Sequence, residues 1–138
     1  MSRNPWAAPP VVLLLINYLR PLGRVGTKRK PGDPFPFRTV ARVAGSDDPW
    51  RGWDDAVVSV HTFDETDVGA LQEAWETHRH LTGLSVNPQQ QIQVDGLGAF
   101  TVQYCDPILG PVEVEEDDAG FVHYVSRFEV GVGFSLLP

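Results

Sequence analysis

A chain of 138 residues and 15.3 kDa is long enough for one domain with its own hydrophobic core. Its composition, with 42% hydrophobic residues and 21% charged residues, excludes a wholly disordered or collagen-like chain. The formal net charge of −7 argues against a surface that is basic throughout, of the kind that binds nucleic acids or anionic membranes. We therefore expect a single domain over residues 1–138, with residues 1–10 as a flexible N-terminal arm.

The charge is divided unevenly along the chain. Residues 1–42 hold eight basic side chains and one acidic one, a net charge of +7, whereas residues 43–138 carry a net charge of −14. Such asymmetry indicates partners rather than fold.

The single cysteine and the short apolar runs of the chain indicate the cellular compartment in which the protein is expected. Cys105 is the single cysteine, which excludes an intrachain disulfide and a cysteine-based zinc site. The longest apolar run, residues 11–16, is far shorter than the roughly 20 residues that span a bilayer. We expect a soluble, intracellular protein without a membrane partner.

The first half of the chain predicts one helix and two strands. Two prolines followed by an apolar run predict a helix over residues 11–22. Residues 23–36 contain too many glycines and prolines for regular structure and predict a long basic loop. Alternating side chains predict a strand over residues 37–43, with its arginines on the solvent face. The β-branched residues 56–63 predict a second strand, antiparallel to the first.

The second half predicts one more helix and two more strands. A helix is expected over residues 67–81, capped by Asp64 or Thr66. The side chains expected to face the sheet are Val68, Leu71, Ala74, Trp75, His78 and Leu81. Residues 92–105 and 121–134 predict strands, separated by a Pro- and acid-rich excursion. The order α-β-β-α-β-β predicts an α+β fold, a mixed four-stranded sheet with two helices packed on one face.

No motif in the sequence indicates catalysis or a bound cofactor. The serines and Cys105 lack a nucleophile signature. His78 and His80, two apart on a predicted helix, point in divergent directions and cannot readily chelate one ion. The glycines near Lys28 lack the preceding strand and following helix of a phosphate loop. We expect no enzymatic activity, no cofactor and no metal ion.

Two polar features are candidates for binding. The basic run at residues 28–30 is a solvated loop, a docking surface for an acidic protein, or a weak nucleic-acid contact. The tryptophan pair around Arg51 is an interface hot spot or a loop folded over a sheet edge. The candidate interface residues, for docking on a tube or between subunits, are Arg24, Lys28, Arg29, Lys30, Arg38, Arg42, Trp50, Arg51 and Trp53.

Taken together, several segments resemble the tail terminator proteins of long-tailed phages, the lambda-type terminator family. The resemblance is one of order and pattern over residues 13–132: an apolar helix, VGTKRKPGDPFPF leading into RTVARVAG, AVVSVHTFDET, DVGALQEAWETHRHL and a closing FVHYVSRFEVGV. The positions that match the family's "PFxxVxRVGG"-like and "YxxxFxVxV" strands are Pro34, Phe35, Pro36, Phe37, Val40, Arg42, Val43, Ala44 and Gly45, then Tyr124, Phe128, Val130 and Val132.

This resemblance implies a non-enzymatic virion protein at the head-proximal end of the tail, assembled in the host cytoplasm. Six copies would form a ring that caps the tail tube and stops its polymerisation. The implied partners are further copies of the chain, the tail tube protein and head–tail connector or neck proteins, with DNA only passing through the channel.

Three alternatives remain open on the sequence alone. In the same class, the alternative is another ring-forming neck or head-completion protein. A basic module over residues 20–42 would bind nucleic acid. An enzyme would need titratable groups that converge in a crevice between helix and sheet, and the sequence shows no such cluster.

Overall fold

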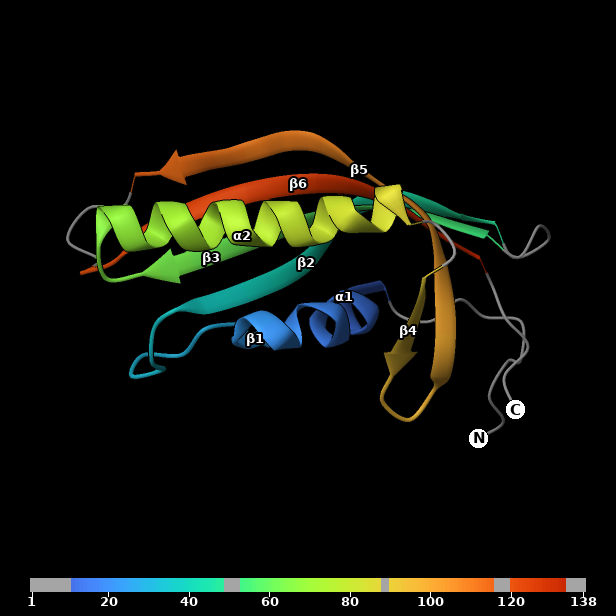
Figure 1. Cartoon of the computed structure of the whole chain (residues 1–138), viewed down its shortest axis with the longest axis horizontal. Helices are drawn as coiled ribbons and strands as arrows, with labels where there is room; N and C mark the ends of the chain where they lie inside the picture. Colours follow the sequence, from blue (N-terminus) through green and yellow to red (C-terminus); the bar gives the residue numbers. More distant parts are fainter. Residues whose placement is uncertain (1–10, 49–52, 88–89, 116–119, 134–138) are drawn as a thin grey trace.

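The strands form one curved sheet that carries both helices on the same face (Figure 1). The computed structural model describes residues 11–48, 53–87, 90–115 and 120–133, so the predicted N-terminal arm lies outside the described residues. In chain order the elements are α1 (Val11–Leu19), the 3₁₀ turn η1 (Arg20–Leu22), β1 (Arg24–Gly26), β2 (Phe37–Asp48), β3 (Trp53–Asp64), α2 (Asp67–Val86), β4 (Gln91–Val94), β5 (Gly98–Val114) and β6 (Val122–Gly133).

The predicted four-stranded sheet and the order α-β-β-α-β-β are wrong. The sheet is a mixed half-barrel of six strands in the spatial order β1-β2-β3-β6-β5-β4, and the chain order is α-β-β-β-α-β-β-β. One missing strand is β1, whose three residues lie among glycines and prolines. It is held by parallel pairing with the start of β2, where Arg24 lies opposite Phe37. Local sequence patterns carry no signal for such a short, non-local pairing.

The other additional strand comes from a hairpin that the sequence presents as one strand. Gly96 and Gly98 adopt φ angles of +78° and +107°, so the chain reverses there and β4 pairs antiparallel with the start of β5. β5 then continues to Val114, through a stretch predicted to be an excursion. Its prolines are compatible with a strand because β4 covers only the start of β5, so the remainder is an edge of the described sheet. The register with β6 shifts three times along it.

The core lies between the helices and one face of the sheet. Alternate side chains of the central strands point into it, and the buried even-numbered positions of β2 are Arg38 and Val40. The expectation that the arginines of residues 37–43 face solvent is therefore wrong for Arg38, which is fully buried beside Val40, whereas Ala41 is exposed. Because arginine counts as polar in a hydropathy pattern, the pattern assigns it to the solvent face even when it is buried. The alternation along this strand therefore predicted the wrong face for Arg38.

Helix α2 packs through small side chains. Ala70, Ala74 and Thr77 are buried, which brings the helix close to the strands, and Leu81 and Leu84 complete this face. The face expected from the sequence is only partly correct. Val68, Leu71 and Trp75 are 64%, 41% and 44% exposed, whereas Ala74 and Leu81 point inward as expected.

The start of α2 follows one of the two predicted caps. Thr66 has an extended backbone, and its hydroxyl accepts a hydrogen bond of 3.0 Å from the Gly69 amide. At the other end the helix continues to Val86, beyond the predicted boundary. Neither helix of the described residues combines the length and the apolar character needed to cross a membrane.

Cys105 is predicted to be inert in the folded protein. Its side chain is fully buried in the core, and desolvation, together with the nearby Asp106 carboxylate, raises the pKa of the thiol to about 12. Because the thiolate is the nucleophile, only about one thiol in 10⁴ is reactive at pH 8. We expect alkylation by iodoacetamide to be at least a hundredfold slower in native protein than in 8 M urea, a comparison that intact-mass spectrometry makes directly. Equal rates would show that the thiol is open to solvent.

Candidate docking site

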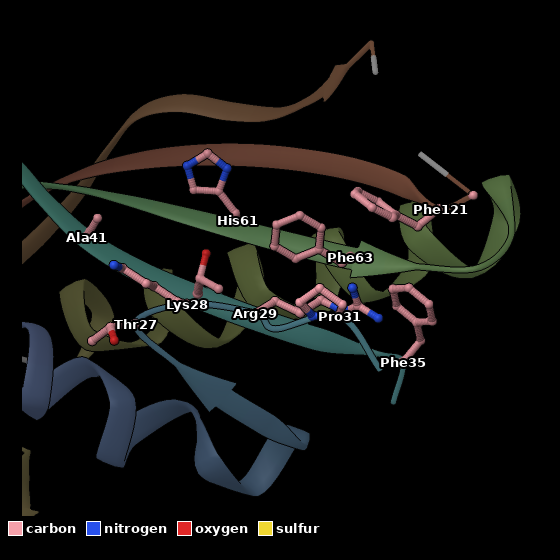
Figure 2. Close-up of a pocket in the computed structure, with 11 residues that line it drawn as sticks. Thr27, Lys28, Arg29, Pro31, Phe35, Ala41, His61, Phe63 and Phe121 are labelled. Carbon is pink, nitrogen blue, oxygen red and sulfur yellow. The ribbon is translucent and has the colours of Figure 1, made fainter. Parts of the chain in front are cut away.

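A concavity lies on the face of the sheet opposite the helices. It has a volume of about 810 Å³ and is bounded by the loop after β1, the outward face of β2 and β3, and the residues that lead into β6 (Figure 2). Its lining residues are Thr27, Lys28, Arg29, Pro31, Phe35, Thr39, Ala41, His61, Phe63, Gly120 and Phe121. Two of them are cationic and none is acidic. We call this cavity the basic pocket.

Arg29 is fixed in the wall of the basic pocket. Its guanidinium lies 4.0 Å from the centre of the Phe35 ring and 5.7 Å from that of Phe121, distances typical of cation–π contacts. Nη2 donates a hydrogen bond to the Asp33 carbonyl oxygen. The Nε atom is buried without a hydrogen-bond partner among the described residues. Arg29 therefore orders the loop, whereas the exposed Lys28 ammonium is available to an anionic ligand.

Aromatic and imidazole rings make up the floor of the basic pocket. Phe63 stacks on His123 with a centroid distance of 4.3 Å and meets Phe121 edge to face at 5.4 Å. The sheet order brings these residues together, because β3 pairs with β6 and sets Phe63 opposite His123. The apolar floor lowers the local dielectric constant, so a cation at its rim attracts an anion more strongly than in open water.

A hydrogen-bonded chain of three side chains lies beside this floor. Ser59 Oγ is 3.0 Å from His61 Nε2, and His61 Nδ1 is 2.5 Å from His123 Nε2. This is the order of nucleophile, base and orienting group in a hydrolase. Ser59, however, is only 2% exposed and does not line the pocket, so a substrate carbonyl cannot reach its hydroxyl. We interpret the chain as a network that joins β3 to β6.

The structure describes the side chains of six of the nine predicted interface residues, and these six do not all lie at the surface. Lys28 and Arg29 line the basic pocket. Arg24 on β1 and Lys30 in the following loop are exposed. Trp50 and Arg51 lie outside the described residues, and only the backbone of Trp53 is described.

The two arginines of β2 are used within the subunit. The Arg38 side chain is fully buried; its Nε donates to Thr77 Oγ1 at 2.7 Å and its Nη2 pairs with the Glu73 carboxylate. Arg42 forms two hydrogen bonds with the buried Asp54 carboxylate, at 2.6 and 3.0 Å. Arg38 therefore stabilises the packing of α2 on β2 rather than offering a charge at the surface.

Sequence reasoning missed the aromatic half of the basic pocket. His61 and Phe63 alternate with the core residues Val60 and Thr62, so their outward direction follows once the inner face of β3 is known. Their proximity to Phe121 depends on the pairing of β3 with β6, for which the sequence has no local signal. Within the described ranges, no group of three or more histidine, cysteine or acidic side chains could hold a metal ion.

Comparison with known proteins identifies the fold. No protein-family model and no curated protein sequence matches the chain. Among solved structures, a chain described as "Virion of native gene transfer agent (GTA) particle" superposes with a TM-score of 0.55 at 12% identity. The match covers 96% of this chain and 99% of that chain. The two chains therefore share one fold over nearly their whole length.

Proposed function

We propose that this chain is a structural virion protein that caps a phage-like tail tube as a six-membered ring. The ring ends tube polymerisation and offers the surface to which the head-side neck proteins attach. The observation that carries the proposal is the end-to-end likeness to a virion chain of similar length. The order of motifs over residues 13–132, which resembles tail terminators, supports the same assignment.

The basic pocket supports a docking role. Its cations and apolar floor suit a carboxylate presented by an apolar segment of a protein. A tube cap must bind on one side and stop growth on the other, which requires a surface specific to a protein partner. The strongly acidic remainder of the chain would repel DNA that passes through the ring.

Disruption of the gene in its own genome tests this function. Loss of a tube cap should give tails that exceed the normal length, visible by negative-stain electron microscopy. Tails of normal length that fail to join heads would instead identify a neck protein. Particles indistinguishable from the wild type would overturn both roles. Binding of the purified chain to duplex DNA, strong at 50 mM salt and lost at 200 mM, would favour the nucleic-acid-binding alternative.

The two exposed lysines of the loop provide a test of docking. We expect the double variant Lys28→Ser, Lys30→Ser to complement the disrupted gene about tenfold less well than the wild type, because it loses the Lys28 charge at the pocket and the exposed Lys30 charge in the same loop. Its free energy of unfolding should stay within about 0.5 kcal/mol of the wild-type value.

Arg79→Ser is the matched control for this docking test. Arg79 is also exposed and lies on α2, away from the pocket, and among the described residues it forms an ion pair with Glu76 on the same helix. It should complement normally. Full complementation by the lysine variant at low salt would show that the loop charges take no part in docking.

A further inference from the structure

The free part of β5 and the adjacent side of α2 carry exposed apolar side chains. On β5, Ile108, Leu109 and Val112 are 55%, 38% and 46% exposed, and on α2 Leu71 and Trp75 are exposed to a similar degree. Large apolar side chains gathered in one region commonly mark an interaction site. β6 pairs with this part of β5 on one side, and on the other side it has no strand neighbour among the described residues, because β4 pairs only with the start of β5.

The two sets of side chains lie on either side of the β5 edge. Leu109 and Val112 share the register of Arg127 and Val125, on the sheet face opposite the helices, whereas contacts within the chain place Trp75 near β5 on the helix side. Trp75 meets His78 edge to face at 5.3 Å, and His78 lies 5.4 Å from Phe128. Phe128 is the register partner of Pro107, which immediately precedes Ile108. Trp75 therefore lies on the side of α2 that faces β5, and Figure 1 shows the helix running beside this strand.

Three acidic side chains border this apolar region, and one cation, the exposed Arg127 of β6, lies opposite Leu109. Asp106 and Glu113 are exposed on β5, and Asp67 is exposed at the start of α2. Burial raises the pKa of Tyr124, and the carboxylates of Glu113 and Asp67 raise it further, which places both acids near one side chain. We call this region the β5 edge surface; it comprises Leu71, Trp75, Ile108, Leu109, Val112, Asp67, Asp106 and Glu113.

The opposite edge of the sheet is basic. Arg24 lies on β1, the terminal strand, and Lys28 and Lys30 follow it in the loop. Three strands separate β1 from β5, a distance of about 19 Å along the sheet. The two edges of one subunit therefore cannot meet each other, but those of successive copies can.

We propose that the β5 edge surface of one copy binds the basic edge of the next, so that subunits associate head to tail. The contact is heterologous, with different surfaces on its two sides, and repetition closes a ring when the rotation between copies allows it. The inference rests on the proposed ring and adds which two surfaces form it. The apolar side chains become buried between copies, and the acids around them pair with Arg24, Lys28 and Lys30.

Side chains, rather than an extended sheet, mediate this contact. Pro107, Gly110 and Pro111 interrupt the edge of β5, and its register with β6 shifts between these positions. Proline and bulges at an edge strand oppose the addition of another strand. The partner therefore packs against the β5 edge surface without continuing the hydrogen-bonded ladder.

Charge reversal on each side provides the test. One variant carries Lys28→Glu and Lys30→Glu, and a second carries Asp106→Lys and Glu113→Lys. Each variant alone should remain monomeric at concentrations where the wild type forms rings, because every contact then joins like charges. An equimolar mixture should restore rings in which the variants alternate. Light scattering gives the ring mass, and native mass spectrometry should find only even numbers of subunits with both variants in equal amounts.

Other results of this mixing experiment would overturn the edge-to-edge contact. Rings formed by either variant alone, or a mixture that stays monomeric, would place the interface elsewhere and leave the tube-capping function intact. A wild-type chain that is monomeric even at a concentration on the order of 1 mM would also exclude the contact. The proposed function itself falls only if disruption of the gene leaves tails and heads unchanged.

A second pair of variants tests the apolar part of the surface. Trp75→Ser should shift ring dissociation to at least tenfold higher protein concentration, since a half-exposed tryptophan at the centre of an interface is a typical hot spot. Leu13→Ser is the matched control, because Leu13 lies on α1 and, at 43%, is exposed to the same degree as Trp75. Equal effects of the two substitutions would contradict the proposed surface.

Discussion

Replacing Arg38 with alanine should lower the free energy of unfolding by about 3 kcal/mol, because the substitution removes a fully buried guanidinium from its ion pair with the part-exposed Glu73 carboxylate. The Arg38 guanidinium contacts Thr77 and Glu73 on α2, and it also donates to the Leu22 carbonyl oxygen at 3.3 Å. Alanine would leave these acceptors without their donor beneath the helix. Urea denaturation should show a lower midpoint with an unchanged slope.

The exposed arginine Arg20 supplies the control for this measurement. Its ion pair with Asp95 has side chains 55% and 68% exposed, so Arg20→Ala should change the free energy of unfolding by no more than about 0.5 kcal/mol. A loss below about 1 kcal/mol for Arg38→Ala would show that the guanidinium is not needed to hold α2 on β2.

The contrast between the buried Arg38 and the exposed Arg20 shows why only some of the predicted interface residues carry a charge at the surface. Net charge and clustering identify basic residues but cannot tell whether a guanidinium reaches solvent. Arg38 is fully buried and Arg42 is paired with Asp54, whereas Arg24, Lys28 and Lys30 remain at the surface. Part of the split into a basic first third and an acidic remainder is thus also spatial. Arg24, Lys28 and Lys30 lie at β1 and the loop after it, and Asp106 and Glu113 lie on β5.

Local patterns predicted the elements that depend on local chemistry. The Thr66 cap and the strong alternation of β3 and β6 are readable from neighbouring residues. The parallel pairing of β1, the hairpin at Gly96 and the long edge strand β5 are not, because each depends on partners distant in sequence or on single backbone angles. For the same reason, the sequence indicated only the cationic loop that borders the basic pocket. Its loop cations stand out in the sequence, but its floor needs the β3–β6 pairing.

The same dependence on backbone angles makes Gly45→Ala the second substitution with a large expected effect. Gly45 has a φ of +133°, and a Cβ there would lie 2.7 Å from Ala56 Cα and still closer to the Asp55 carbonyl oxygen. Neither backbone atom can move without breaking the β2–β3 ladder, so we expect urea denaturation to show a free energy of unfolding lower by about 3 kcal/mol or more.

Two other glycines provide the controls. Gly98→Ala, with φ +107° and nothing within 4 Å, should lower the free energy of unfolding by only about 1–2 kcal/mol. Gly110→Ala, open and without a positive φ, should be nearly neutral. Equal losses at all three positions would contradict the close approach of the two strands.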